Sequence, residues 1–156
     1  MSRAYYEDIA LGLRFGGETY RVERDEMLAF ARQWDPRPIH VDDQAAAAAG
    51  FGSAIASGAY TTAIFTTLSL RSRTRAGDHA ILAGLGAEIR LPHPVRAGDT
   101  LRYEAEIVAK RDSASRPDAG VIHTLARLVN PEGVVVYESK TATLVEKRPL
   151  LSEKEA

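Results

Sequence analysis

The sequence predicts an α+β domain, in which an antiparallel sheet of five strands packs against helices on one face. Three observations predict this class. A short alternating segment lies near the N-terminus, helical periodicity runs from residue 25 to about residue 70, and four strand-like segments follow in succession. The length of 156 residues fits one domain. We expect this domain to span residues 1–148 and a polar tail to span residues 149–156.

The composition excludes several classes of function. The formal net charge of −1 provides no broad positive field for a nucleic-acid backbone. Cysteine is absent, which excludes disulfides, thiolate metal sites and a cysteine nucleophile. The first residues do not resemble a secretion signal, and no apolar run has the length of a membrane span. We therefore expect a soluble, cytoplasmic protein without a nucleic-acid or membrane partner.

The first strand is expected within residues 13–23, and a helix follows it. From Asp25 the apolar residues fall at i, i+3, i+4 and i+7, which places one stripe on a helix: Met27, Phe30, Ala31 and Trp34. Pro36 ends this helix, because the residue before a proline is disfavoured in the helical region. Pro38 is expected to keep the next few residues extended or turned.

Two further helices are expected before the remaining strands. Asp42 is a good N-cap for a brief helix through the alanines 45–49, which Gly50 ends. A longer helix of about three to four turns begins at Ser57-Gly58. It is uncharged as far as residue 70, so we expect it to be largely buried, with its large apolar residues on one side: Tyr60, Ile64, Phe65 and Leu68.

Four strands are expected after a loop over residues 71–78, and they span residues 81–91, 101–109, 121–129 and 134–145. The turn Asn130-Pro131-Glu132-Gly133 joins the last two as a hairpin. One central helix cannot cover both faces of a five-stranded sheet, yet these strands carry apolar residues on both sides. We therefore predict a homodimer or a higher homo-oligomer.

Asp35 and His40 are the residues most suited to catalysis. They lie five residues apart, with two prolines between them. On an α-helix such a pair points about 140° apart, whereas a proline-stiffened turn holds it together at little entropic cost. A carboxylate beside an imidazole orients the ring and tunes its basicity, which suits the pair to activating water. His40 also precedes the 42–49 helix, whose positive end disfavours the imidazolium.

Other interpretations of this segment stay open. Asp35-Pro36 is also typical of a plain turn, with His40 as a structural loop histidine. The run His40, Asp42 and Asp43 has ligand types that bind metals, although no second histidine cluster lies nearby in the sequence.

Ser57 and Gly58 form a second candidate site. A glycine at the start of a buried helix leaves backbone N–H groups free to donate at the positive end of the helix dipole. Such donors hold a thioester carbonyl and stabilise an enolate oxygen as its charge develops. The alternative is an ordinary helix start, with Ser57 as the cap and Gly58 chosen for close packing.

These motifs resemble the MaoC-like dehydratase family, which includes the (R)-specific enoyl-CoA hydratases. The family pattern Asp-x-Asn-Pro-aliphatic-His is matched at Asp35, Pro38, Ile39 and His40. The aliphatic-x-[His/Ser]-Gly start of a buried helix is matched over residues 55–58. Residues 91–101 match the family's strand, Pro-Val, Gly-Asp turn and next strand, so the resemblance covers roughly residues 5–146.

The resemblance implies a hotdog fold, in which a five-stranded antiparallel sheet wraps around a central helix and an overhanging helical segment carries the Asp/His loop. It implies a carbon–oxygen lyase of fatty acid metabolism that acts on a 2-enoyl-CoA or 3-hydroxyacyl-CoA thioester, works as a dimer and needs no cofactor. Asp35 and His40 would bind the catalytic water, and the Gly58 N–H would polarise the thioester carbonyl. Thr66 lies where family members often carry a small hydroxyl.

Two positions depart from the family pattern. Arg37 replaces the family's Asn, and Trp34 stands where glycine is frequent. One hypothesis is that Arg37 contacts the substrate and selects a polar or carboxylated acyl group. Two other functions also fit a hotdog domain: an acyl-CoA thioesterase and a non-catalytic acyl-CoA-binding subunit.

Overall fold

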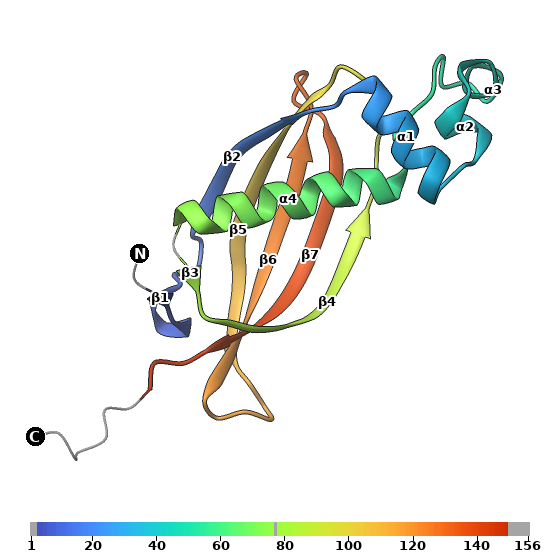
Figure 1. Cartoon of the computed structure of the whole chain (residues 1–156). Coiled ribbons are helices and arrows are strands. Elements are labelled where there is room, and N and C mark those ends of the chain that lie inside the picture. The colour runs from blue at the N-terminus through green and yellow to red at the C-terminus, as the bar shows by residue number, and fades with distance from the viewer. Residues whose placement is uncertain (1–2, 77, 150–156) are drawn as a thin grey trace, which may run out of the picture.

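The computed structural model describes residues 3–76 and 78–149. Its main sheet has five antiparallel strands in the order β2-β5-β6-β7-β4. Their bounds are Arg14–Arg21 (β2), Ile81–Arg90 (β4), Thr100–Asp112 (β5), Ala119–Val129 (β6) and Val135–Glu146 (β7). The sheet curves around one long helix, α4 (Gly58–Ala76), which crosses its concave face (Figure 1). This is the hotdog arrangement expected from the sequence.

Three helices lie together beyond one end of the sheet, beside the start of α4 (Figure 1). They are α1 (Arg24–Trp34), α2 (Pro38–Val41) and α3 (Asp43–Ala48). At the opposite end, β1 (Arg3–Ala4) and β3 (Asp78–His79) form a small parallel pair. A 3₁₀ turn (Tyr6–Asp8) lies between β1 and β2 along the chain. The overhanging segment expected for the Asp/His loop is therefore present. No helix among the described residues has the length and apolar character to span a membrane.

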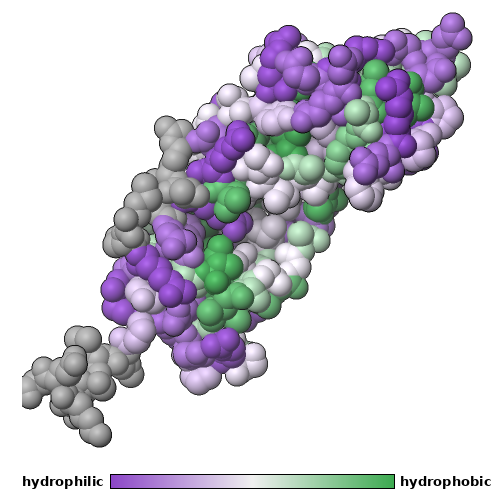
Figure 2. Space-filling view, in the orientation of Figure 1, coloured by the Kyte–Doolittle hydropathy of each residue, from purple (hydrophilic) through white to green (hydrophobic). Residues whose placement is uncertain are grey.

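The core lies between α4 and the concave face of the sheet. Tyr60, Ile64 and Leu68 of α4 are buried there, as the sequence predicts. The opposite face of α4 is exposed and carries Ala59, Ala63, Thr66 and Leu70. The expectation that this helix is largely buried was therefore wrong for one of its faces. Figure 2 shows the side of the molecule on which α4 lies, with hydrophobic and weakly polar residues along its middle.

Three other local features differ from the predictions or refine them. The central helix continues through residues 71–76, which were expected to form a loop. Residues 38–41 form one helical turn, because Pro38 stands in its first turn, where a proline costs no hydrogen bond and its fixed φ suits a helix. Trp34 is 66% exposed, although it shares the stripe of the buried Met27 and Ala31. Trp34 is the last residue of α1, which lies beyond one end of the sheet (Figure 1).

The predicted tail over residues 149–156 lies outside the described residues, apart from Pro149. No observation therefore tests it.

Candidate active site

The structure brings Asp35 and His40 together. Asp35 is the C-cap residue of α1, and its backbone N–H still donates to the Ala31 carbonyl oxygen. His40 lies in the single turn α2, which begins two residues after the proline that ends α1. His40 Nε2 lies 3.6 Å from Asp35 Oδ2, and both side chains are largely buried, with exposures of 5% and 17%. The bend at Pro36 between α1 and α2 thus brings the side chains of Asp35 and His40 together, which a continuous helix could not do.

A hydrogen bond to the backbone determines which nitrogen of His40 carries the proton. Nδ1 lies 2.9 Å from the carbonyl oxygen of Ile55. A carbonyl oxygen only accepts hydrogen bonds, so Nδ1 must donate. In the neutral ring, Nε2 therefore has a free lone pair, and this atom faces Asp35. From the sequence we expected the positive end of α3 to affect the protonation of this ring. In the structure, the direct hydrogen-bond partner of the ring is the carbonyl oxygen of Ile55.

Arg37 forms a two-point ion pair with Asp35. Its Nε donates to Oδ1 and its Nη2 donates to Oδ2, both at 2.7 Å. The hydrogen bonds and positive charge of Arg37 lower the pKa of Asp35 below its ordinary value, while the burial of the carboxyl group opposes this shift. Asp35 is consequently an ionised hydrogen-bond acceptor near neutral pH.

The start of α4 presents a backbone donor to the same region. Ser57 is completely buried, and its Oγ accepts a hydrogen bond from the Tyr60 N–H at 3.1 Å, so it acts as the N-cap. Within the described residues, the Gly58 N–H has no hydrogen-bond partner. A Cβ atom at Gly58 would lie 2.9 Å from Leu91 Cδ1. Ser57 thus caps the helix and Gly58 packs closely, as the alternative interpretation predicts. A contact between the Gly58 N–H and a substrate stays a prediction.

A cavity of about 390 Å³ is lined by His40, Arg37 and Gly58, whereas Asp35 lies behind them and is not among its lining residues. It is mostly apolar, and its lining includes Arg37, Ile39, His40, Phe51, Ile55, Ala56, Gly58, Thr61 and the segment 91–95. Thr61 and His93 were not predicted to lie here. His93 Nδ1 lies 3.1 Å from the Val135 carbonyl oxygen. The local sequence did not indicate that His93 lines this cavity, because the segment after β4 comes beside α4 only in the folded structure.

Two predicted substrate contacts lie away from this cavity. Ser57 does not line it, since its hydroxyl faces the first turn of α4. Thr66 is exposed, and its hydroxyl donates to the Thr62 carbonyl oxygen at 2.9 Å. A contact between Thr66 and substrate stays a prediction. Thr61, which is buried, is the hydroxyl residue of α4 that the cavity includes.

The carboxylates that follow His40 have structural partners. Asp42 accepts from the Ala45 N–H at 2.9 Å and caps α3. Asp43 pairs with Arg24 at 2.8 Å and accepts from the Ala54 N–H. Over residues 3–76 and 78–149, no group of three or more histidine, aspartate and glutamate side chains is arranged to hold a metal ion. These contacts favour structural roles for the two carboxylates over metal ligation.

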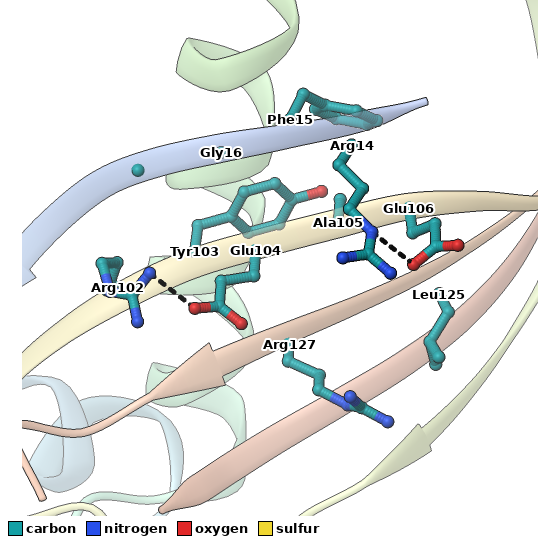
Figure 3. A pocket seen from close by; sticks show the side chains of 11 residues that line it. Arg14, Phe15, Gly16, Arg102, Tyr103, Glu104, Ala105, Glu106, Leu125 and Arg127 are labelled. Atoms are coloured by element: carbon teal, nitrogen blue, oxygen red, sulfur yellow. Dashed lines mark hydrogen bonds and ion pairs between the residues drawn. The ribbon is translucent and has the colours of Figure 1, made fainter. Parts of the chain in front are cut away.

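A larger hollow of about 530 Å³ lies across β2, β5 and β6 (Figure 3). Three of its lining residues are arginines, and each is paired with a glutamate: Arg14 with Glu106, Arg102 with Glu104, and Arg127 with Glu138. Figure 3 shows the first two of these pairs along the sheet surface. This hollow contains none of the motif residues, so size alone does not make it the functional site.

Comparisons with known proteins agree with the motifs. The family model described as "MaoC like domain" matches residues 12–126. The chain belongs to the MaoC-like dehydratase family. This MaoC-like chain is 28% identical over 142 residues to the "Uncharacterized protein YdeM" of Bacillus subtilis (strain 168), covering 90% of this chain and 98% of that one.

Solved structures share the fold of this MaoC-like protein. The MaoC-like dehydratase from Rhodospirillum rubrum is 38% identical with a TM-score of 0.84, covering 94% of this chain and 99% of that chain. The (R)-hydratase from A. caviae is 24% identical with a TM-score of 0.68, covering 92% and 99% of the two chains. The second likeness shows the fold alone. The family and the fold predicted from the sequence are thus confirmed.

Proposed function

We propose that this protein is a hydratase or dehydratase that adds water to a 2-enoyl-CoA thioester or removes it from a 3-hydroxyacyl-CoA thioester. The observation that carries this proposal is the separation of 3.6 Å between His40 Nε2 and Asp35 Oδ2. With a neutral ring and an ionised carboxylate, both atoms accept hydrogen bonds and neither donates. The distance exceeds that of a direct hydrogen bond and allows one water molecule to contact both atoms.

A water molecule in that position donates one O–H to each acceptor and keeps a lone pair for attack. In the hydration direction, its oxygen bonds to C3 of the enoyl group while His40 Nε2 takes one of its protons. The electron pair of the C2–C3 double bond moves toward the thioester carbonyl, which gives an enolate. The proton on Nε2 then returns to C2, so the water is added completely and the enzyme is regenerated. Asp35 stabilises the imidazolium in between.

The N–H of Gly58 supplies the second requirement of this chemistry. Charge develops on the thioester oxygen as water adds, and a fixed donor at a helix N-terminus stabilises that charge. Gly58 and His40 line the same cavity. A substrate that places its carbonyl at Gly58 therefore has its acyl carbons near the side chain that moves the proton.

The remaining lining of the cavity suits an aliphatic substrate. Ile39, Phe51, Ile55 and Leu91 present apolar surface on several sides of it. The MaoC-like family includes dehydratases and hydratases, and the (R)-hydratase from A. caviae shares this fold. Both facts support the proposed reaction class. The identity of the acyl group and a cytoplasmic location stay predictions.

We also propose that the chain forms a homodimer through β4. This strand is an edge of the sheet and, among residues 3–76 and 78–149, pairs with β7 alone. Large apolar side chains on it or directly after it are exposed: Leu82, Leu85, Ile89 and Leu91. An exposed apolar edge strand is suited to pairing with a second strand. Because Leu91 and the residues after it line the cavity, such a dimer would bring the partner close to the site.

The direct test is turnover of short 2-enoyl-CoA thioesters, followed in two ways. Hydration removes the absorbance of the conjugated enoyl thioester without releasing thiol. A thioesterase instead releases free CoA, which a thiol reagent detects. We expect absorbance loss without thiol release. Thiol release at the same rate as substrate loss would identify a thioesterase, and binding without either signal would identify an acyl-binding subunit.

A further inference from the structure

Arg37 is the residue that most clearly distinguishes this site from the family pattern, in which asparagine occupies its position. Its side chain is 67% exposed, so it is not part of the core. Of its donor groups, Nε and Nη2 both bind Asp35. The planar guanidinium meets the carboxylate with two parallel hydrogen bonds, an arrangement that a lysine or an asparagine cannot reproduce.

This contact has a geometric consequence for Asp35. A carboxylate held at one point is free to rotate about its last bond, whereas one held at both oxygens has a fixed plane. Oδ2 is the atom that Nη2 binds, and the same atom faces His40 Nε2 at 3.6 Å. Each carboxylate oxygen accepts more than one hydrogen bond, so Oδ2 keeps the capacity to bind a water molecule on its His40 side.

We propose that Arg37 is a positioning residue, which fixes the plane of the Asp35 carboxylate beside His40. This role replaces substrate recognition as the function of Arg37, since two of its three nitrogen atoms are already engaged with Asp35. The inference rests on the proposed hydratase function for its kinetic test. Its titration test does not depend on catalysis.

The charged surroundings of Asp35 support this assignment. The groups that interact with it are Arg37 and His40, which line the cavity together with His93. The hydrogen bonds of Arg37 make the largest contribution to the lowered pKa of Asp35; burial raises this pKa, and the charge of His40 lowers it by less than that of Arg37. Removing the guanidinium would leave the carboxyl group partly buried with only the histidine as a possible cation, so its pKa would rise.

The first test is a carboxyl-carbon NMR titration of Asp35 in the ligand-free protein. In Arg37→Gln we expect the Asp35 pKa to rise relative to wild type, and in Arg37→Lys we expect a smaller rise, because the charge remains without the two-point contact. An unchanged Asp35 titration in Arg37→Gln would overturn the inference, whatever reaction the protein catalyses.

The second test is kinetic. For a positioning residue, Arg37→Gln lowers kcat by about 10- to 100-fold, because a small misplacement of a reacting group has a large effect on rate. KM changes little, and Arg37→Lys recovers part of kcat. The preference between crotonyl-type and dicarboxylic thioesters stays the same. A raised KM together with a lost preference for dicarboxylic substrates would instead assign Arg37 to substrate recognition.

The chain offers a matched control. Arg116 binds Asp118, also two residues away, through Nε and Nη2 in the same two-point manner. This pair lies in the loop between β5 and β6, outside the cavity. Arg116→Gln should raise the Asp118 pKa and leave kcat unchanged. An equal loss of kcat in both variants would show that the effect of Arg37 is not specific to the site.

Discussion

The ring of His40 is held by the carbonyl oxygen of Ile55, which lies 2.9 Å from Nδ1. The same residue donates its own N–H to the Ile39 carbonyl oxygen at 3.1 Å. The segment that leads into α4 is thus joined to α2 by two hydrogen bonds. These contacts hold Nε2 of His40 toward Asp35 and, in the neutral ring, leave Nε2 as a hydrogen-bond acceptor.

Replacing His40 with asparagine should lower kcat by about 10²- to 10⁴-fold, the range for loss of a general acid–base group. His123→Asn is a suitable control, because His123 lies in β6 and does not line the cavity. Initial rates with a short enoyl-CoA thioester measure both variants. If His40→Asn retained the wild-type rate, His40 would not be the group that moves the proton.

The environment of Gly58 predicts a steric effect. A Cβ atom there would lie 2.9 Å from Leu91 Cδ1, at the wall of the cavity. We expect Gly58→Ala to raise KM and to lower kcat/KM by about 10-fold or more. Adding Leu91→Ala should restore part of the loss, because it removes the colliding atom.

The rescue by Leu91→Ala decides between two explanations. If the double variant were no better than Gly58→Ala alone, the loss would come from the helix start itself and not from crowding in the cavity.

A carboxylate links α1, α4 and β2 through hydrogen bonds. The hydroxyls of Tyr20 and Tyr60 each donate to Glu26 Oε2 at 2.6 Å. These two bonds lower the pKa of Glu26, with Tyr20 contributing the larger part. Because Glu26 lies on the helix that ends at Asp35, and Tyr60 follows Gly58, this network fixes the two sides of the site relative to each other.

Tyr60→Phe should therefore reduce the free energy of unfolding by about 1 kcal/mol at neutral pH. A lowered folded-state pKa contributes stability above the unfolded pKa of about 4.5 and loses it as the pH falls through the folded value. The difference between wild type and Tyr60→Phe should thus shrink at low pH. Urea unfolding at neutral and acidic pH measures it. If the difference in unfolding free energy between wild type and Tyr60→Phe were the same at both pH values, the charge of Glu26 would not contribute to it.

Much of the fold was predictable because its signals are local. The alternation of apolar residues located all five strands of the main sheet, and the turn at residues 130–133 identified the last hairpin. The helical stripe of α1 was predicted as well, but the exposure of Trp34 was not. Periodicity shows which residues share a face, while only the tertiary structure shows where the core beneath that face ends.

The site was predictable in its residues more than in its contacts. The spacing of Asp35 and His40 indicated a pair, because two prolines exclude a continuous helix between them. The partners that orient this pair were not predictable. Ile55 is fifteen residues from His40 in the chain, and the contact between Arg37 and Asp35 depends on the bend between α1 and α2. Neither contact can be derived from a pattern of residue types alone.

The exposed edge of β4 predicts the assembly. We expect the wild-type protein to sediment as a dimer at micromolar concentration, and Leu85→Lys to shift it toward monomer, because a charge at an apolar interface is costly to bury. Val108→Lys is the control, since Val108 is similarly exposed but lies on β5. A wild-type monomer in analytical ultracentrifugation would contradict the proposed homodimer.

The central claim is that Asp35 and His40 act on one water molecule, and a double-mutant cycle on kcat tests it most directly. Asp35→Asn, His40→Asn and the double variant are compared with wild type in the hydration of a short enoyl-CoA thioester. Residues that act as a unit have non-additive effects, so the double variant should lose about as much as the more damaging single variant. Losses that multiply would show that the two side chains act independently and would contradict the shared water.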